Sequence, residues 1–163
     1  MTIFSKHNLF TISGFQINEL SICIEILKTY NPRAREIINA RWIDYHPNQF
    51  LILEGLKHSS NVIVRDRFIL EMISKLPRTH SLKIFPNITY SMLYYHVKKY
   101  YSHLFVKFKG KKNFKVTHGF RYRAVEQVAS ETKIRDILSH RSIKSGKFYK
   151  PKGVLSNELK TKF

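Results

Sequence analysis

Apolar residues recur at mixed three- and four-residue spacings over residues 17–30, and this pattern limits the fold more than any other feature of the chain. A helix that carries apolar side chains around most of its circumference has to be covered by other elements. The pair Asn31-Pro32 follows directly and ends the pattern. The sequence therefore predicts a well-buried helix with the remaining elements packed against it.

The rest of the chain alternates between helical patterns and one hairpin. The expected helices run from about residue 32 towards 42 and over residues 67–76, 89–104, 117–129 and 131–138, with a final turn near residues 155–159. The expected strands cover residues 50–56, 62–64 and 82–85. Lys57 lies at the lip of the hairpin, and Thr117 is the expected N-cap of its helix. This order predicts a mainly α fold of the α+β class, a helical bundle with a small antiparallel sheet at one edge.

The chain reads as a single domain. It has 163 residues with only 6 Gly and 5 Pro, and no Gly/Ser-rich or Pro-rich linker divides it. We expect one domain over residues 1–163, in which residues 1–16 form an N-terminal lead-in and residues 151–163 a polar tail.

A large positive charge points to a polyanionic partner. Lys and Arg number 29 against 11 Asp and Glu, which gives a net charge of +18. Such a charge favours a nucleic acid or an anionic membrane as the counterpart. The 13% aromatic content excludes intrinsic disorder, and the single Cys23 excludes disulfide frameworks and Cys-based zinc sites. With no apolar run of membrane-spanning length and no signal-peptide core, we expect a soluble, intracellular protein.

Several short patterns can carry chemistry. His118 and Arg121 are three residues apart, so a helix places both on one face, close to free N–H groups that suit a phosphate. His140 is followed nine residues later by Tyr149. Upstream, Arg33 precedes Glu36 by three residues, ahead of Trp42-Ile43-Asp44 and of Lys57 on the hairpin. Each pattern alone is also typical of a solvated basic helix, a packed tyrosine or an ordinary turn.

In this order the patterns resemble the catalytic domain of the tyrosine recombinases, the phage-integrase family. The resemblance covers about residues 17–150, and every catalytic position of the family is filled. Ser139 stands where the family usually has Gly, and Asn31-Pro32 where a Thr-Gly pair is common, but neither change removes a reacting group. Only 16 residues precede the first expected helix, so the N-terminal DNA-clamping domain of the family is expected to be absent.

The resemblance implies site-specific recombination, in which DNA strands are cleaved and rejoined without a metal ion or cofactor. Tyr149 would be the nucleophile that forms a 3′-phosphotyrosyl link, Lys57 the general acid for the leaving 5′-oxygen, and His118 a base or orienting partner. Two arginines would hold the non-bridging oxygens, with Glu36 orienting one of them. The implied catalytic set is Arg33, Lys57, His118, Arg121, His140 and Tyr149.

Double-stranded DNA is the partner that follows, bound by dimers or tetramers of the chain, with residues 153–163 docking on a neighbouring subunit. The expected phosphate contacts are Lys98, Lys99, Lys107, Lys109, Lys111, Lys112 and Lys115. No membrane and no small-molecule substrate is expected. The family implies a cytoplasmic, nucleoid-associated protein of bacterial, phage or plasmid origin.

Three alternatives stay open from the sequence. A telomere resolvase or a type IB topoisomerase uses related chemistry, although both carry extra domains. A non-catalytic DNA-binding protein derived from a recombinase would keep the charge and lose cleavage. A basic RNA-binding or ribosome-binding module would not require the reactive residues to meet in space.

Overall fold

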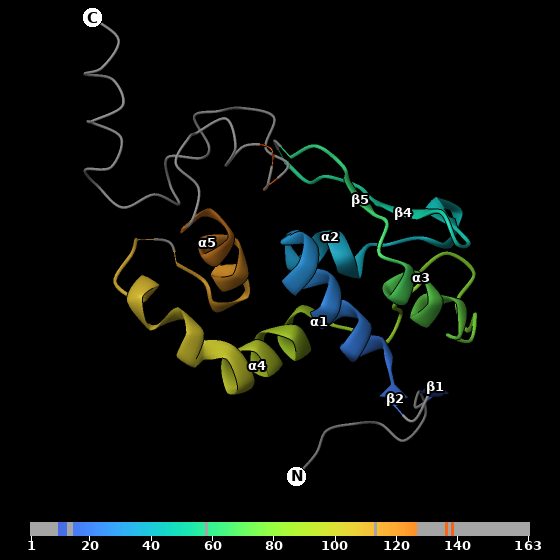
Figure 1. The fold of residues 1–163 in the computed structure, drawn as a ribbon, viewed down its shortest axis with the longest axis horizontal. Helices are drawn as coiled ribbons and strands as arrows, with labels where there is room; N and C mark the ends of the chain where they lie inside the picture. The colour runs from blue at the N-terminus through green and yellow to red at the C-terminus, as the bar shows by residue number, and fades with distance from the viewer. Residues whose placement is uncertain are drawn as a thin grey trace, which may run out of the picture.

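The structure is a computed structural model, and it describes residues 10–12, 15–57, 59–112, 114–126, 136 and 138. Helix α1 (Glu19–Tyr30) lies in the middle of the molecule, with α3 (Arg67–Ser74) on one side and α4 (Tyr90–Tyr101) and α5 (Gly119–Glu126) on the other (Figure 1). The short helix α2 (Ala34–Ile38) follows α1 and packs against it. A three-stranded sheet forms one edge. The predicted mainly α bundle with a small antiparallel sheet is confirmed.

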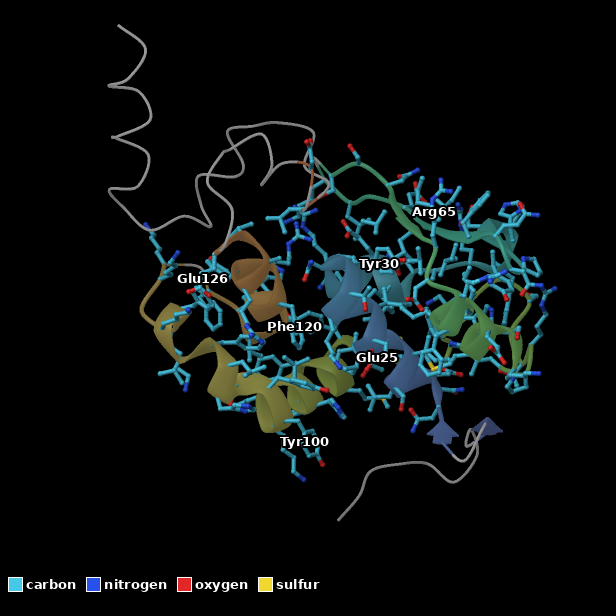
Figure 2. The ribbon with its side chains drawn as sticks, viewed as in Figure 1. Glu25, Tyr30, Arg65, Tyr100, Phe120 and Glu126 are labelled. Atoms are coloured by element: carbon cyan, nitrogen blue, oxygen red, sulfur yellow. The ribbon has the colours of Figure 1, made fainter. Side chains whose placement is uncertain are left out.

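Helix α1 is the buried helix that the apolar spacing predicts. Ile22, Cys23 and Ile26 are fully buried. The helix begins where the side chain of Asn18 accepts a hydrogen bond from the backbone N of Ser21 at 2.8 Å. It ends at Asn31, whose φ of 54° places it in the left-handed region that asparagine tolerates. The end of the helix is also fixed from outside: the hydroxyl of Tyr30 accepts from the backbone N of Arg65 at 2.8 Å, and both side chains lie near the sheet (Figure 2).

The predicted hairpin is present and carries one further strand. Strands β4 (Phe50–Leu53) and β5 (Val62–Val64) pair antiparallel, and β3 (Tyr45–His46) pairs with the outer side of β4. Leu51 and Leu53 turn their side chains into the core, as does Val64. Strand β3 has only two residues, too few for an alternating pattern to reveal it in the sequence. The turn between β4 and β5 therefore lies at the edge of the molecule, outside the helical core (Figure 1).

The predicted strand over residues 82–85 is wrong. This segment makes a single antiparallel bridge between Lys83 and Arg41 instead of a strand. The backbone N of Trp42 donates to the carbonyl of Leu82 at 2.9 Å, and Ile84 and Phe85 are buried. The apolar run therefore fills the core as an irregular segment.

A two-stranded hairpin precedes α1, where the sequence predicted only a lead-in. Strands β1 (Phe10–Ile12) and β2 (Phe15–Ile17) pair antiparallel, with Thr11 opposite Gln16. The sequence contains the signal for it, because apolar and polar residues alternate on both sides of Ser13-Gly14. β2 takes Ile17, so α1 begins at Glu19 and not at residue 17.

The chain after α4 tightens into 3-10 structure. The helix predicted over residues 89–104 ends at Tyr101, and η2 (Ser102–Phe108) continues it as a 3-10 helix. The ring of Phe105 in η2 packs edge-on against Phe120 of α5, with centroids 5.1 Å apart. A Cβ on Gly119 would lie 2.3 Å from the Phe105 ring, so α5 approaches η2 closely only because residue 119 is glycine.

Thr117 is not the N-cap of α5, contrary to the sequence prediction. It lies inside η3 (Val116–His118), the 3-10 turn that leads into α5, and is fully buried. Its hydroxyl shares a hydrogen bond of 3.0 Å with the hydroxyl of Tyr90 on α4. Thr117 therefore fixes η3 to α4. The helix predicted over residues 131–138 lies outside the described residues except for Asp136, which is helical, and Leu138, which is buried.

Candidate active site

Arg33 is held at the start of α2 by a buried carboxylate one turn later. Its backbone N donates to Oε2 of Glu36 at 2.8 Å, and its Nη1 donates to Oε1 at 3.1 Å. The Glu36 side chain is 1% exposed, whereas the Arg33 side chain is 22% exposed. The expected contact between Glu36 and one of the arginines is therefore present, and it leaves part of the guanidinium open to solvent.

The turn that carries Lys57 is fastened to this pair on both sides. The backbone N of Leu56 donates to Oε1 of Glu36 at 3.2 Å, and the carbonyl of Leu56 accepts from Nη1 of Arg33 at 3.2 Å. On the other side, the hydroxyl of Ser59 accepts from the same Nη1. The turn closes where the backbone N of Ser59 donates to the carbonyl of Leu56 at 3.1 Å. Lys57 lies between, exposed and with a φ of 59°.

Gly55 allows this turn to close tightly. A Cβ at this position would lie 2.4 Å from the carbonyl oxygen of Ser59 and 2.5 Å from that of Ser60. The backbone N of Gly55 donates to Oδ1 of Asn61 at 3.0 Å, across the hairpin. A larger residue at 55 would push the two sides of the turn apart and with them the anchors of Lys57.

His118 is half-buried in η3 and is surrounded by positive charge. Its pKa is lowered from 6.5 to about 4, first by burial and then by the positive charges of Arg121, Arg33, Lys115 and Lys57, in that order of effect. The charges that act on this imidazole come from Arg33 before α2, Lys57 on the hairpin, Lys115 before η3 and Arg121 on α5. The imidazole is neutral at pH 7.

Arg121 is buried in the interior of the protein. It is 1% exposed, its Nη1 donates to the carbonyl of Asn31 at the end of α1, and its Nη2 donates to the carbonyl of Leu138 at 3.1 Å. A buried guanidinium has to be paired or hydrogen-bonded, and these carbonyls satisfy two of its nitrogens. The sequence prediction that His118 and Arg121 share one face is met only in part, since the arginine points inward.

We expect the imidazole of His118 to titrate near pH 4 in a pH series of heteronuclear NMR spectra. The unfolded chain takes up this proton near pH 6.5 and the folded chain only near 4, so the free energy of unfolding falls as the pH drops through this interval, by at most about 3 kcal/mol. Lys57→Met should move the pKa of His118 upward. Lys75→Met, an exposed lysine on another part of the surface, is the control and should leave it unchanged. A titration at 6.5 in the wild-type protein would contradict this arrangement.

Two of the predicted catalytic residues, His140 and Tyr149, lie outside the described residues. Of the six, the structure thus brings together Arg33, Lys57, His118 and Arg121, which come from positions nearly ninety residues apart in the sequence.

The predicted phosphate-binding lysines occupy two surfaces. Lys98 and Lys99 are exposed on α4, where the ammonium of Lys99 lies 5.2 Å from the centre of the Tyr100 ring, on the outer side of the helix (Figure 2). Lys107 pairs with Glu126, and Lys111 lies 5.1 Å from the centre of the Tyr122 ring. The others, exposed around η3, are Lys109, Lys112 and Lys115.

Sequence reasoning missed the role of Ser59. It assigned this residue to the hairpin turn, but a serine in a turn carries no signal that its hydroxyl meets an arginine 26 positions upstream. Ser59 is 1% exposed. A buried polar residue in a surface turn is the unusual feature, and it becomes visible only in three dimensions.

The fold is similar to that of a solved recombinase. A XerH site-specific recombinase, solved in a pre-cleavage complex bound to its difH substrate, has a TM-score of 0.55 and 15% identity over 85% of this chain. The fold is that of a tyrosine recombinase catalytic domain. A XerA recombinase has a TM-score of 0.49 and 13% identity over 96% of the chain. No protein-family model and no curated protein matches the sequence.

This recombinase fold spans only part of those proteins. The chain covers 44% of the XerH chain and 66% of the XerA chain. Within the described part of the chain, no three His, Cys, Asp or Glu side chains lie close enough together to hold a metal ion. None of the helices described combines the length and the hydropathy needed to cross a bilayer.

Proposed function

We propose that this chain cleaves and rejoins DNA strands by transesterification, with Tyr149 as the nucleophile and a 3′-phosphotyrosyl link as the intermediate. One observation carries the proposal. In a tyrosine recombinase fold, Arg33 is hydrogen-bonded to the turn that carries Lys57, Arg121 is hydrogen-bonded to the carbonyl of Asn31 two residues before Arg33, and the charges of all three act on the neutral imidazole of His118. A site of this kind is built to receive one negatively charged phosphodiester.

In the first step, the phenol oxygen of Tyr149 forms a bond to phosphorus and the bond to the 5′-oxygen breaks. The leaving 5′-oxygen takes a proton from the ammonium of Lys57, and the phenol proton passes to His118. The number of phosphoester bonds does not change. A 5′-hydroxyl from the same or another strand can therefore reverse the step and rejoin the DNA.

His118 becomes a better base when the substrate is bound. In the free protein its pKa is about 4, too low to take a phenol proton efficiently. A phosphate placed among the same cations adds negative charge and raises the pKa of the imidazole. Proton transfer is thereby favoured only in the complex.

The two arginines would act differently. The hydrogen bonds of the Arg33 side chain to described residues all use Nη1, so Nε and Nη2 remain for a non-bridging oxygen. Arg121 is bound to two backbone carbonyls and acts chiefly through the positive charge of its buried guanidinium. His140 is proposed as a further donor to the same oxygens.

Duplex DNA is the proposed substrate, and two or four copies of the chain would act on it together, with residues 151–163 as the contact between subunits. The net charge of +18 and the exposed lysines around η3 support contact with phosphates. Such contacts position a duplex and do not select a sequence, so the recognition site is left to other residues.

Covalent capture from a random pool tests the function without a known site. The protein is incubated with duplexes of random sequence, each nicked so that the 5′-fragment diffuses away after cleavage, in a buffer with EDTA. We expect DNA that stays attached to protein in SDS, and we expect mass spectrometry to place the nucleotide on the peptide that contains Tyr149. Adducts are expected in EDTA because the cations take the place of a metal ion.

Two results would contradict the proposal. Adducts that form only with added divalent cation would require a different mechanism. DNA that is retarded in a gel but never captured, even after repeated rounds of selection, would favour the non-catalytic DNA-binding alternative.

A further inference from the structure

The hydrogen bonds that hold the Lys57 turn differ in whether they use backbone or side-chain atoms of the turn. Leu56, which precedes Lys57, is fastened through its backbone N to Glu36 and through its carbonyl to Arg33. Ser59, two residues after Lys57, is fastened through its side-chain hydroxyl to Arg33. A backbone anchor survives almost any substitution, whereas the anchor at 59 depends on the residue type.

Arg33 does not need Ser59 to stay in place. Glu36 binds both the backbone N and Nη1 of Arg33. The two hydrogens of Nη1 are shared among three acceptors, namely the Glu36 carboxylate, the Leu56 carbonyl and the Ser59 hydroxyl. Without Ser59, each hydrogen still has an acceptor. The hydrogen bond between the Ser59 hydroxyl and Arg33 therefore serves mainly to hold the Lys57 turn in place, because Glu36 already holds Arg33.

Lys57 is the residue that such an anchor affects. Its φ of 59° lies in the left-handed region, which costs a non-glycine residue free energy and persists only where the surroundings impose it. The bonds at Leu56 and Ser59 impose it from the two sides. Without the Ser59 hydroxyl, the turn keeps the backbone hydrogen bond from Ser59 to the carbonyl of Leu56 but loses its attachment to Arg33 on that side, which changes where the ammonium of Lys57 lies relative to Arg33.

We propose that Ser59 is a positioning residue for leaving-group protonation: its hydroxyl fixes the turn to Arg33 and thereby holds Lys57 over the phosphate that Arg33 binds. The inference rests on the proposed strand cleavage. A proton donor has to lie within hydrogen-bond distance of the oxygen that it protonates, and displacement by about 1 Å can cost about 100-fold in rate. Ser59 thus keeps Lys57, the proposed general acid, at a fixed position relative to Arg33, the proposed phosphate-binding group.

The test compares two leaving groups in Ser59→Ala. One nicked substrate, selected by covalent capture, carries the natural 5′-oxygen at the scissile bond, and the other carries a 5′-sulfur. When the bond from phosphorus to sulfur breaks, the thiolate leaves with its electron pair and needs no proton. We expect Ser59→Ala to form adduct about 10- to 100-fold more slowly than wild type on the oxygen substrate. On the sulfur substrate the two proteins should agree within about threefold.

The controls separate this inference from the function itself. Ser60→Ala changes the exposed neighbouring serine and should match wild type on both substrates. Lys57→Ala should show the same pattern as Ser59→Ala, with a larger loss on oxygen. Equal losses on oxygen and sulfur in Ser59→Ala overturn the proposal, because Ser59 then supports the fold or the whole site. An unchanged rate on oxygen also overturns it and leaves strand cleavage intact. A wild-type protein that forms no adduct with either substrate contradicts the proposed function and this inference together.

Discussion

Tyr149→Phe is expected to abolish the covalent adduct, with a loss on the order of 10⁴-fold or more in the rate of its formation. Phenylalanine keeps the ring and removes the oxygen that has to bond to phosphorus, so no other part of the site can replace it. The measurement is the fraction of nicked duplex that stays attached to protein in SDS. Retardation of the same duplex in a native gel should change little, because the proposed phosphate contacts come from lysines elsewhere.

The matched control is Tyr95→Phe. Tyr95 is 67% exposed on α4, so losing its hydroxyl changes the protein by the same atom without touching the cation cluster. It should form adduct at the wild-type rate. An adduct that persists in Tyr149→Phe would assign the nucleophile to another residue, and the peptide map of the captured DNA would identify it.

The parts of the site that could be predicted are those that local chain geometry places together. Arg33 and Glu36 are three residues apart, which is the spacing between an N-cap and the helical residue that reaches back to it, and they do meet. The hairpin over β4 and β5 follows from two short apolar runs around a polar turn, and it puts Lys57 at the turn. In both cases the residue pattern that predicts the structure lies within a stretch of about twenty residues or fewer.

The parts that could not be predicted depend on contacts between distant segments. Ser59 is buried because Arg33 reaches it, and Arg121 points inward because Asn31 presents a carbonyl at the end of α1. The same helical spacing of His118 and Arg121 is compatible with an exposed pair or with one buried partner. Thr117 failed as a cap because its hydroxyl meets Tyr90, 27 residues upstream. Tertiary hydrogen bonds override local preference in each case.

The cation cluster has a consequence for the free protein. Arg33, Lys57, Lys115 and Arg121 are all close enough to lower the pKa of His118, so they also repel one another. Glu36, which is almost fully buried, compensates one of these charges. We expect an anion such as a phosphate to relieve the repulsion that remains, whatever specific contacts it makes.

Arg33→Lys is expected to lower the rate of adduct formation by about 10²- to 10³-fold while leaving retardation of DNA in a native gel nearly unchanged. The arginine uses Nη1 to hold the Glu36 carboxylate and the Lys57 turn, and in the proposed mechanism its remaining nitrogens bind the phosphate. A lysine carries the same charge on a single nitrogen, which cannot hold the turn and a phosphate oxygen in the same geometry. The measurement is the single-turnover rate on a captured nicked duplex, with a melting temperature recorded for each variant.

Arg35→Lys is the matched control, because Arg35 lies two residues away on α2 and is exposed. The same chemical change there should leave the rate at the wild-type value, since Arg35 is not among the charges that act on His118. If both variants cleave like wild type, charge alone suffices at position 33 and the two-sided role of its guanidinium is wrong. If Arg33→Lys loses adduct formation but regains it on the 5′-sulfur substrate, its defect lies in the Lys57 turn. A loss on both substrates places the defect at the non-bridging oxygens, because those oxygens carry the developing charge whichever atom leaves.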